Sequence, residues 1–341
     1  MTIKSIEIDL DELINKSIYI IREALTQFKN PAMLWSTGKD STAMMYLVKM
    51  ASPDNKIHLP IIHLDTNCKF PEIYEYRDRL AKEWGFKLII GKNEEAIGEG
   101  ITPEKVGHFN CCNTLKTEAL KIILRKYKFD ALILSIRHDE HYMRNLERIF
   151  SPRDKEFNWH IVRPKTKEEM REGDAPFVSE QQVELWDLWQ TDFGENINHV
   201  RVHPILMWTE LDVWRFMKKY NIPFNPLYRA DYVGQKFGYK KRCLNKEFEI
   251  KNGKFKECPE YNKEVNDENI LKCHKCGTEL IGKRFRSLGC QPCTVPVDSN
   301  ASTIDEIIEE LKTTDVTERS GRSQDKEKEQ VMRRLRSMGY P

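Results

Sequence analysis

Apolar and polar positions follow two different periods along the N-terminal half of the chain. Short apolar runs predict buried strands, at 32–35, 59–64, 87–90 and 131–136. Stretches with an apolar residue every three or four positions predict helices, over 8–28, 42–50, 70–84 and 113–127. Strands that alternate with helices typically form a parallel sheet with helices on both faces. We therefore expect an α/β fold around a parallel, twisted sheet.

The rest of the chain shows weaker periodicity and a different composition. Residues 151–200 are polar and predict a long active-site loop, whereas 208–221 and 303–312 have the spacing of helices. Residues 230–282 are rich in lysine and contain four cysteines, which predicts a small insertion stapled by metal. The tail over 317–339 is densely charged, and its part from Thr317 to Ser323 is either solvated or part of the active site or of a partner contact.

These differences divide the chain into three expected units. A nucleotide-binding α/β domain over 1–229 is followed by a cysteine-rich insertion over 230–282, for which we expect zinc. A C-terminal segment over 283–341 would complete the active site and offer a surface to a partner.

One turn carries the clearest candidate chemistry, because it follows the first predicted strand and opens the next helix. Its residues are Ser36, Thr37, Gly38, Lys39, Asp40 and Ser41. Such a turn needs small residues to bend tightly, and amide groups at a helix start form an anion site. Lys39 adds a positive charge for pyrophosphate oxygens, and Asp40 would hold Mg²⁺ or anchor the loop. The glycine spacing of a Walker A loop is missing, so a plain strand–helix turn remains the alternative.

Composition limits the partners and the compartment. The net charge is only +2, so neither nucleic acid nor a membrane surface is expected as the main partner. The N-terminal residues are acidic and amphipathic rather than basic and apolar, so we expect no secretory signal and a cytoplasmic protein. Nine cysteines in a cytoplasmic protein indicate metal chemistry rather than disulfides.

The loop resembles the pyrophosphate loop of ATP pyrophosphatases, which activate a substrate by adenylation. Longer segments resemble the small, catalytic subunit of the bacterial heterodimeric ATP sulfurylase: H-L-D-T-N-C-K-F-P-E-I-Y-E-Y-R-D at 63–78, R-H-D-E at 137–140, E-R-I-F-S-P-R-D at 147–154, R-V-H-P-I-L-M-W-T-E-L-D-V-W at 201–214 and R-F-R-S-L-G-C at 284–290. The resemblance implies an adenine nucleotide α-hydrolase-like fold. It also implies that ATP and sulfate react to give adenosine 5′-phosphosulfate and pyrophosphate.

In that reaction a sulfate oxygen attacks the α-phosphorus in line with the departing pyrophosphate, so catalysis consists of positioning and charge neutralisation. Lys39 and the loop amides would stabilise the pyrophosphate together with Mg²⁺. Arg137, Arg144 and Arg148 are candidates for sulfate and the α-phosphate, because guanidinium fits such oxyanions. Surface salt bridges are the alternative for the last two arginines. Asp65 is a candidate contact for the nucleotide.

The resemblance also implies a partner protein. The product is a mixed phosphoric–sulfuric anhydride whose formation is strongly uphill, and the family couples it to GTP hydrolysis in a large subunit. The sequence contains no GTPase loop, so we expect that GTPase large subunit as a separate chain.

Two sets of cysteines depart from this family. The first resembles the iron-sulfur form of adenylylsulfate reductase, in which a Cys-Cys pair and a C-x-x-C pair hold a 4Fe-4S cluster. It comprises Cys111, Cys112, Cys290 and Cys293. Zinc or buried free thiols are the alternatives for this set. The second set, for which we expect a zinc site, comprises Cys243, Cys258, Cys273 and Cys276.

Three other functions stay open. Adenylylsulfate reduction would use the cluster, but those reductases need a cysteine near the C-terminus, and the last cysteine here is Cys293. They also lack the lysine-bearing loop. ATP-dependent thiolation of tRNA would suit a cysteine-rich module with Lys240, Lys241 and Arg242. A nucleotide-binding scaffold without catalysis is the last alternative.

Overall fold

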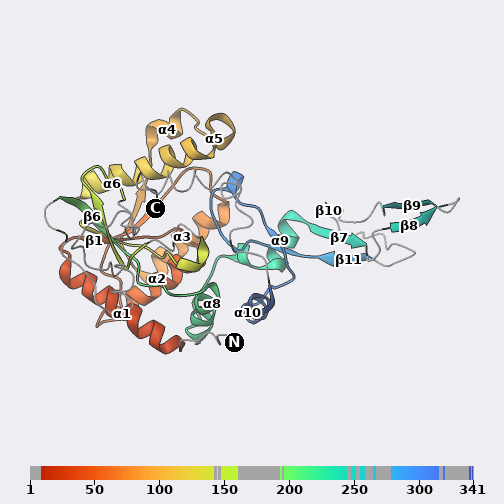
Figure 1. Ribbon diagram of the computed structural model, residues 1–341, viewed down its shortest axis with the longest axis horizontal. Coiled ribbons are helices and arrows are strands. Elements are labelled where there is room, and N and C mark those ends of the chain that lie inside the picture. Colours follow the sequence, from red (N-terminus) through yellow and green to blue (C-terminus); the bar gives the residue numbers. More distant parts are fainter. Residues whose placement is uncertain are drawn as a thin grey trace, which may run out of the picture.

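The computed structural model describes residues 9–141, 144, 147–159, 193, 196–243, 247–250, 254–257, 264–265, 278–314, 318, 338 and 340. At its centre lies a six-stranded sheet with the strand order β3-β2-β1-β4-β6-β5 (Figure 1). In that order the strands are Leu88–Gly91, Ile61–Leu64, Pro31–Leu34, Ala131–Ile133, Ile197–Val202 and Phe150–Asp154. All neighbours pair in parallel except the edge strand β5, which is antiparallel to β6. The predicted α/β fold with a mostly parallel sheet is confirmed.

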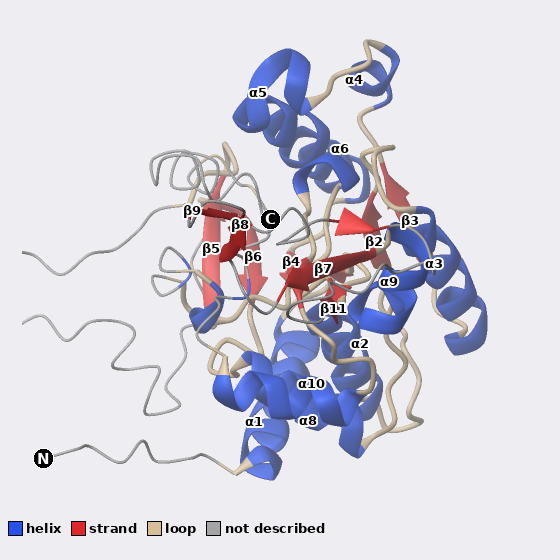
Figure 2. Cartoon of the chain, turned by 90° about the vertical axis from the view of Figure 1, so that its right-hand side faces the viewer, coloured by secondary structure: helices blue, strands red, loops and turns tan. Residues whose placement is uncertain are grey.

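Helices cover both faces of the sheet, with α1, α2 and α8 on one side and α5 and α6 on the other (Figure 2). Because the central strands are covered twice, they consist of continuous apolar runs rather than alternating residues. The helices are α1 (Leu10–Gln27), α2 (Lys39–Ala51), α3 (Pro71–Trp84), α4 (Glu94–Gly98), α5 (Pro103–Cys112), α6 (Ala119–Tyr127), α8 (Glu210–Lys219), α9 (Ala230–Phe237) and α10 (Ile304–Thr313). Within the described ranges, none of the helices combines the length and apolarity needed to cross a bilayer.

Two predicted helices differ in detail from the structure. The helix expected over 42–50 begins at Lys39, so half of the phosphate loop belongs to the first turn of α2. The helix expected over 113–127 starts as a π-helix, η1 (Asn113–Glu118), and becomes α-helical only in α6. Short π-helical segments are often found at functional sites.

The polar region expected as a loop over 151–200 contributes strands to the sheet. Most of β5 and the first residues of β6 fall in it, whereas residues 160–192 and 194–195 lie outside the described residues. Buried charges hide these strands from a hydropathy pattern. Arg153 donates to Glu147 at 3.0 Å with both side chains fully buried, and Arg201 donates to the Tyr340 carbonyl at 2.8 Å. Paired charges can replace apolar residues in a core.

The cysteine-rich insertion extends away from the main body (Figure 1) and contains regular structure. Its strands are β7 (Tyr239–Cys243), β8 (Glu247–Ile250), β9 (Lys254–Glu257), β10 (Glu264–Val265) and β11 (Thr278–Ile281). Strand β7 pairs antiparallel with β10 and β11, and β8 pairs antiparallel with β9. Of the predicted zinc ligands, Cys258, Cys273 and Cys276 lie outside the described residues, as does the side chain of Cys243.

After the insertion the chain returns to the main body. A short antiparallel pair, β12 (Lys283–Arg284) with β13 (Val297–Asp298), encloses the 3₁₀ turn η5 (Gln291–Cys293), and α10 packs against α8. Two further 3₁₀ turns stand earlier in the chain, η2 (His138–Glu140) and η4 (Pro226–Tyr228). These returning segments place residues from the last sixth of the chain beside the loop that follows β1.

Candidate active site

The loop after β1 is closed by its own hydroxyl groups. Ser36 Oγ lies 3.0 Å from Ser41 Oγ and accepts a hydrogen bond from the Gly38 amide at 3.3 Å. Thr37, rather than the glycine, has the left-handed conformation, with φ of 67°. The glycine has an ordinary φ of −74°, and a Cβ there would lie 3.3 Å from Ser36 Oγ. The sharp bend therefore strains Thr37, and such strain is concentrated at functional sites.

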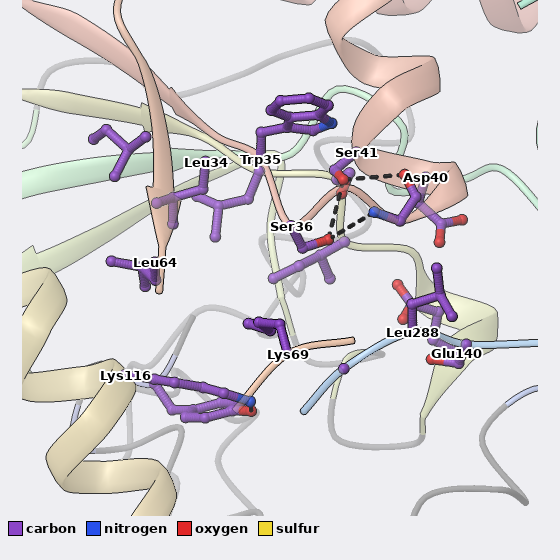
Figure 3. Close-up of a pocket in the computed structure, with 18 of the residues that line it drawn as sticks. Leu34, Trp35, Ser36, Asp40, Ser41, Leu64, Lys69, Lys116, Glu140 and Leu288 are labelled. Carbon is purple, nitrogen blue, oxygen red and sulfur yellow. Dashed lines mark hydrogen bonds between the residues drawn. The ribbon is translucent and has the colours of Figure 1, made fainter. Parts of the chain in front are cut away.

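A pocket of about 1050 Å³, its open mouth included, lies at the carboxyl ends of β1, β2 and β4. Parallel sheets typically bind ligands in this position, and the volume is sufficient for a nucleotide. One wall is apolar and consists of Leu34, Ile62, Leu64, Leu134 and Ile136. Figure 3 shows Ser36, Asp40 and Ser41 on one side of the cavity and Lys69 and Lys116 across from them.

A carboxylate from the C-terminal part of the chain binds the two central cations of the predicted site. Glu318 accepts hydrogen bonds from Lys39 Nζ through one oxygen and from Arg137 Nη2 through the other. The side chains of Lys39 and Arg137 are fully buried, and neither residue is among the described residues that line the pocket. Lys39 and Arg137, the two cations expected to bind phosphate, are thus already paired with a carboxylate of the protein.

Further charges complete this network. Lys39 Nζ donates to Asp40 at 3.2 Å and to the Arg286 carbonyl at 3.2 Å, and it lies 3.8 Å from Glu210. Arg286 donates to the same Glu210 at 2.5 Å. Arg137 pairs with Asp40 and donates to Asp139 at 2.9 Å. Three cations therefore face four carboxylates in this part of the described structure.

Burial and charge act in opposite directions on these groups. Burial by itself favours the neutral form of Glu318, but Arg137 and Lys39 outweigh it and hold the carboxyl pKa well below its usual value. The same pairing raises the pKa of Arg137 against the effect of its burial. For His63 on β2, burial and then the charge of Lys69 lower the pKa to about 3. It is therefore neutral and donates from Nδ1 to the Trp35 carbonyl at 3.0 Å.

The other predicted site residues occupy different positions. Arg144 lines the pocket and is paired with Glu140. Arg148 lies over the Phe193 ring, 5.9 Å from its centroid, and is not among the described lining residues. Asp65 is also outside that lining, and it accepts hydrogen bonds from the Asn67 amide at 2.8 Å and from the Tyr74 hydroxyl at 2.9 Å.

The sequence alone did not single out several residues of the site. Lys69, Lys116 and Tyr340 line the pocket, and Tyr228 OH accepts from the Lys39 amide at 3.0 Å. Lys116 Nζ donates to Tyr340 OH at 3.2 Å and lies 5.5 Å from the centre of that ring. Lys69 lies within the matched segment at 63–78 and Lys116 lies four residues after Cys112, but only the fold brings them together with the loop.

The four cysteines of the first predicted set gather at a second, small pocket. All four side chains are buried there, and the half-buried Cys68 belongs to the same lining. Burial, followed by the neighbouring thiols, raises the pKa of Cys111 to about 12. Thr66 Oγ1 lies 3.2 Å from Cys290 Sγ, and Lys69 pairs with Cys290 in an isolated antiparallel bridge.

The donor set of this pocket fits a soft metal or an iron-sulfur cluster, because four thiols converge on it. Nevertheless, no group of three or more His, Cys, Asp or Glu side chains among the described residues is arranged as a metal site. The structure thus shows a gathering of thiols rather than a formed ligand cage.

Comparisons with known proteins agree with this geometry. Residues 30–296 match the family model of the phosphoadenosine phosphosulfate reductase domain. The chain is 38% identical over 338 residues to sulfate adenylyltransferase subunit 2 of Bacteroides thetaiotaomicron, with 97% of each chain covered. It is 36% identical over 338 residues to the protein of that name from Pseudoalteromonas translucida, with 97% of this chain and 98% of the relative covered.

A solved structure is also similar. The phosphoadenylyl-sulfate reductase of Candida auris, in a phosphate complex, matches with a TM-score of 0.42 and 14% identity, over 66% of this chain and 93% of that chain. The family model covers residues 30–296, and both relatives are matched over almost their whole length. They show that the chain carries a phosphoadenosine phosphosulfate reductase domain and belongs to the family of sulfate adenylyltransferase subunit 2.

Proposed function

We propose that this chain transfers the adenylyl group of ATP to sulfate, which yields adenosine 5′-phosphosulfate and pyrophosphate. The observation that carries this proposal is the position of the Ser36–Ser41 loop, which lines one large pocket at the start of α2. The apolar wall of that pocket suits an adenine base, and the helix start suits phosphate oxygens. The family to which the chain belongs is named for this reaction.

In this proposal the pyrophosphate of ATP lies on the loop, close to Lys39 and Arg137. The two cations neutralise the charge that develops on the leaving group. Asp40 lines the pocket beside them and would hold Mg²⁺, which adds further neutralisation when it is bound. Sulfate must approach the α-phosphorus from the side opposite the leaving group, so its oxygen enters from across the cavity.

Arg144 is the sulfate-binding arginine that the pocket supports. It lines the cavity, and its guanidinium is paired with Glu140, which lines the same cavity. We assign Arg148 no direct contact with substrate, because it lies over Phe193 outside the described lining. Asp65 orders the turn after β2 through Asn67 and therefore acts on the nucleotide through the backbone.

We also propose that Cys111, Cys112, Cys290 and Cys293 hold a 4Fe-4S cluster. The proposal is supported by four buried thiols on a single cavity, which is the ligand set that such clusters use. A cluster there would cross-link segments that surround the active site, and no step of adenylyl transfer passes through it. Buried free thiols and zinc remain the alternatives, and iron and zinc analysis of an anaerobic preparation decides among them.

The remaining proposals concern regions that the structure describes only in part. We propose that the insertion over 230–282 binds zinc through Cys243, Cys258, Cys273 and Cys276. We also propose that it separates a nucleotide-binding domain over 1–229 from a C-terminal segment over 283–341. The relatives are named as subunit 2, so we propose a second subunit, a GTPase in a separate chain, as partner. The cytoplasm is the proposed compartment, because ATP is supplied there.

Sulfate-dependent exchange of labelled pyrophosphate into ATP tests the central proposal. The chain is purified anaerobically and assayed alone and with its GTPase subunit, in the presence and absence of sulfate. Exchange that requires sulfate is the expected result, because adenylyl transfer is reversible. Absence of exchange under all of these conditions would refute adenylyl transfer to sulfate.

A second candidate function rests on the gathered cysteines and on the matching domain family. In it the chain would reduce adenylylsulfate, and a thiol reductant would release sulfite from that compound. The same preparation, supplied with adenylylsulfate and reduced thioredoxin, is assayed for sulfite. Sulfite release without pyrophosphate exchange would favour reduction, whereas exchange without sulfite release excludes it as the main activity.

A further inference from the structure

The phosphate site already contains an anion that belongs to the protein. Glu318 places one carboxylate oxygen on Lys39 and the other on Arg137, and its side chain is only 7% exposed. A phosphate group binds a lysine and an arginine in the same way, with one oxygen for each cation. The carboxylate therefore occupies the position at which the leaving group of ATP is expected.

The charges around this position make the simultaneous presence of pyrophosphate and Glu318 unfavourable. The described network holds three cations and four carboxylates, so it is already negative when Glu318 is ionised. A pyrophosphate group would add several negative charges in a buried setting, where repulsion is only weakly screened. Removal of Glu318 would leave three cations facing three carboxylates and would free donors of Lys39 and Arg137 for the ligand.

The position of Lys39 relative to the pocket also indicates that Glu318 and pyrophosphate cannot bind it together. Ser36, Gly38, Asp40 and Ser41 of the loop line the pocket, but Lys39 does not, although it lies between them in the sequence. Its ammonium group is enclosed by Glu318, Asp40 and the Arg286 carbonyl. A ligand can therefore touch the loop while Glu318 is in place, but it cannot bind the lysine.

We infer that Glu318 is an internal competitor for the pyrophosphate subsite and that ATP or pyrophosphate displaces its carboxylate from Lys39 and Arg137. This inference rests on the proposed use of the loop for ATP and assigns the two cations to the leaving group. When no nucleotide is bound, Glu318 also keeps the two buried cations, Lys39 and Arg137, paired with a negative charge.

The test measures pyrophosphate binding by calorimetry, without sulfate and without turnover, on the full chain and on E318Q. Glutamine keeps the size of the side chain and removes its charge, so pyrophosphate should bind about tenfold more tightly to the variant. E310Q is the matched control, since Glu310 also pairs with a buried arginine, Arg284 at 2.6 Å, but lies outside the described pocket lining. Its affinity for pyrophosphate should equal that of the wild type.

Unchanged or weaker pyrophosphate binding by a folded E318Q overturns the inference. A weaker affinity that is restored by raising Mg²⁺ would identify Glu318 as a metal ligand rather than a competitor. Amide hydrogen exchange on the unmodified protein gives a second measurement that needs no variant. The peptide containing Glu318 should exchange faster when pyrophosphate is added, and unchanged exchange at saturating ligand also overturns the inference. A chain that binds pyrophosphate but makes no adenylylsulfate would refute the proposed function and leave this result intact.

Discussion

The phosphate pocket and the cysteine pocket adjoin each other and differ in the chemistry of their lining. The phosphate pocket adjoins a dense network of charges, in which Glu318 bridges Lys39 and Arg137. The cysteine pocket is lined mainly by thiols and apolar groups, and burial raises the pKa of Cys111 there. Lys116 lines both pockets and is the residue that they share. Charge chemistry and soft-ligand chemistry thus stand side by side, with Lys116 between them.

The origin of each pocket in the chain also differs. The core of the phosphate pocket is a contiguous loop that folds on its own hydroxyl groups. The cysteine pocket exists only where the end of α5, the turn after β2 and the turn η5 meet. A local change should therefore damage the first pocket directly, whereas the second depends on how distant segments pack.

The largest effect is expected from Lys39→Met, which keeps the length of the side chain and removes its charge. Loss of a buried donor that faces the leaving group should lower kcat/KM for adenylyl transfer by roughly 10²–10³-fold. Lys49→Met on the same helix is the control, because Lys49 lies over Tyr46 and Trp84, away from the described pocket lining. If Lys39→Met kept more than about a tenth of the wild-type kcat/KM, the function of the phosphate pocket would not depend on the charge of Lys39.

A smaller effect is expected from Arg144→Gln, which tests where the sulfate binds. The KM for sulfate should rise roughly tenfold to a hundredfold, while the affinity for ATP stays nearly constant, because only the acceptor loses a guanidinium partner. Arg148→Gln is the matched variant, and its sulfate KM should change by less than about threefold. Equal effects of the two substitutions would show that the pocket lining does not identify the acceptor site.

Cys290→Ser sharpens the thiol side of the comparison. If the four cysteines hold a cluster, this variant should lose the broad absorbance near about 400 nm and its iron in an anaerobic preparation. Affinity for ATP should change by less than about threefold, since Cys290 itself is not among the described residues that line the phosphate pocket. Cys68→Ser, on the same pocket lining, should keep both iron and absorbance. Wild-type protein without iron would reject the cluster.

The smallest effect concerns His63 on β2, the strand whose carboxyl end leads into both pockets. Its folded pKa of about 3 lies below the ordinary value of 6.5, so only the unfolded chain takes up a proton between these values. Stability therefore falls as pH decreases through this window, by about 1.4 kcal/mol per pH unit at most. Denaturant unfolding should show a shallower pH dependence for His63→Gln. Equal slopes for His63→Gln and the wild type would contradict the lowered pKa of His63.

Comparison of sequence and structure shows why some elements could be predicted. The strands around Met33, Ile61 and Leu132 are covered on both faces, so their apolar runs stand out from the sequence. Strand β6 was not predicted, because His199 and Arg201 interrupt its apolar residues and His203 follows them. All three of these polar side chains are nevertheless buried. Their polar atoms are accommodated by tertiary partners such as the carbonyl groups of Tyr340 and Arg148, which hydropathy cannot register.

The site itself shows the same division. By itself the sequence determined the loop from Ser36 to Ser41, its place after a buried strand and the likeness to an adenylating family, because these depend on neighbouring residues. Only the tertiary structure decided that Arg144 lines the pocket and Arg148 does not, and that four separated cysteines converge. It also placed Glu318 on Lys39 and Arg137. Contacts between residues far apart in the chain depend on packing geometry, which a linear pattern does not contain.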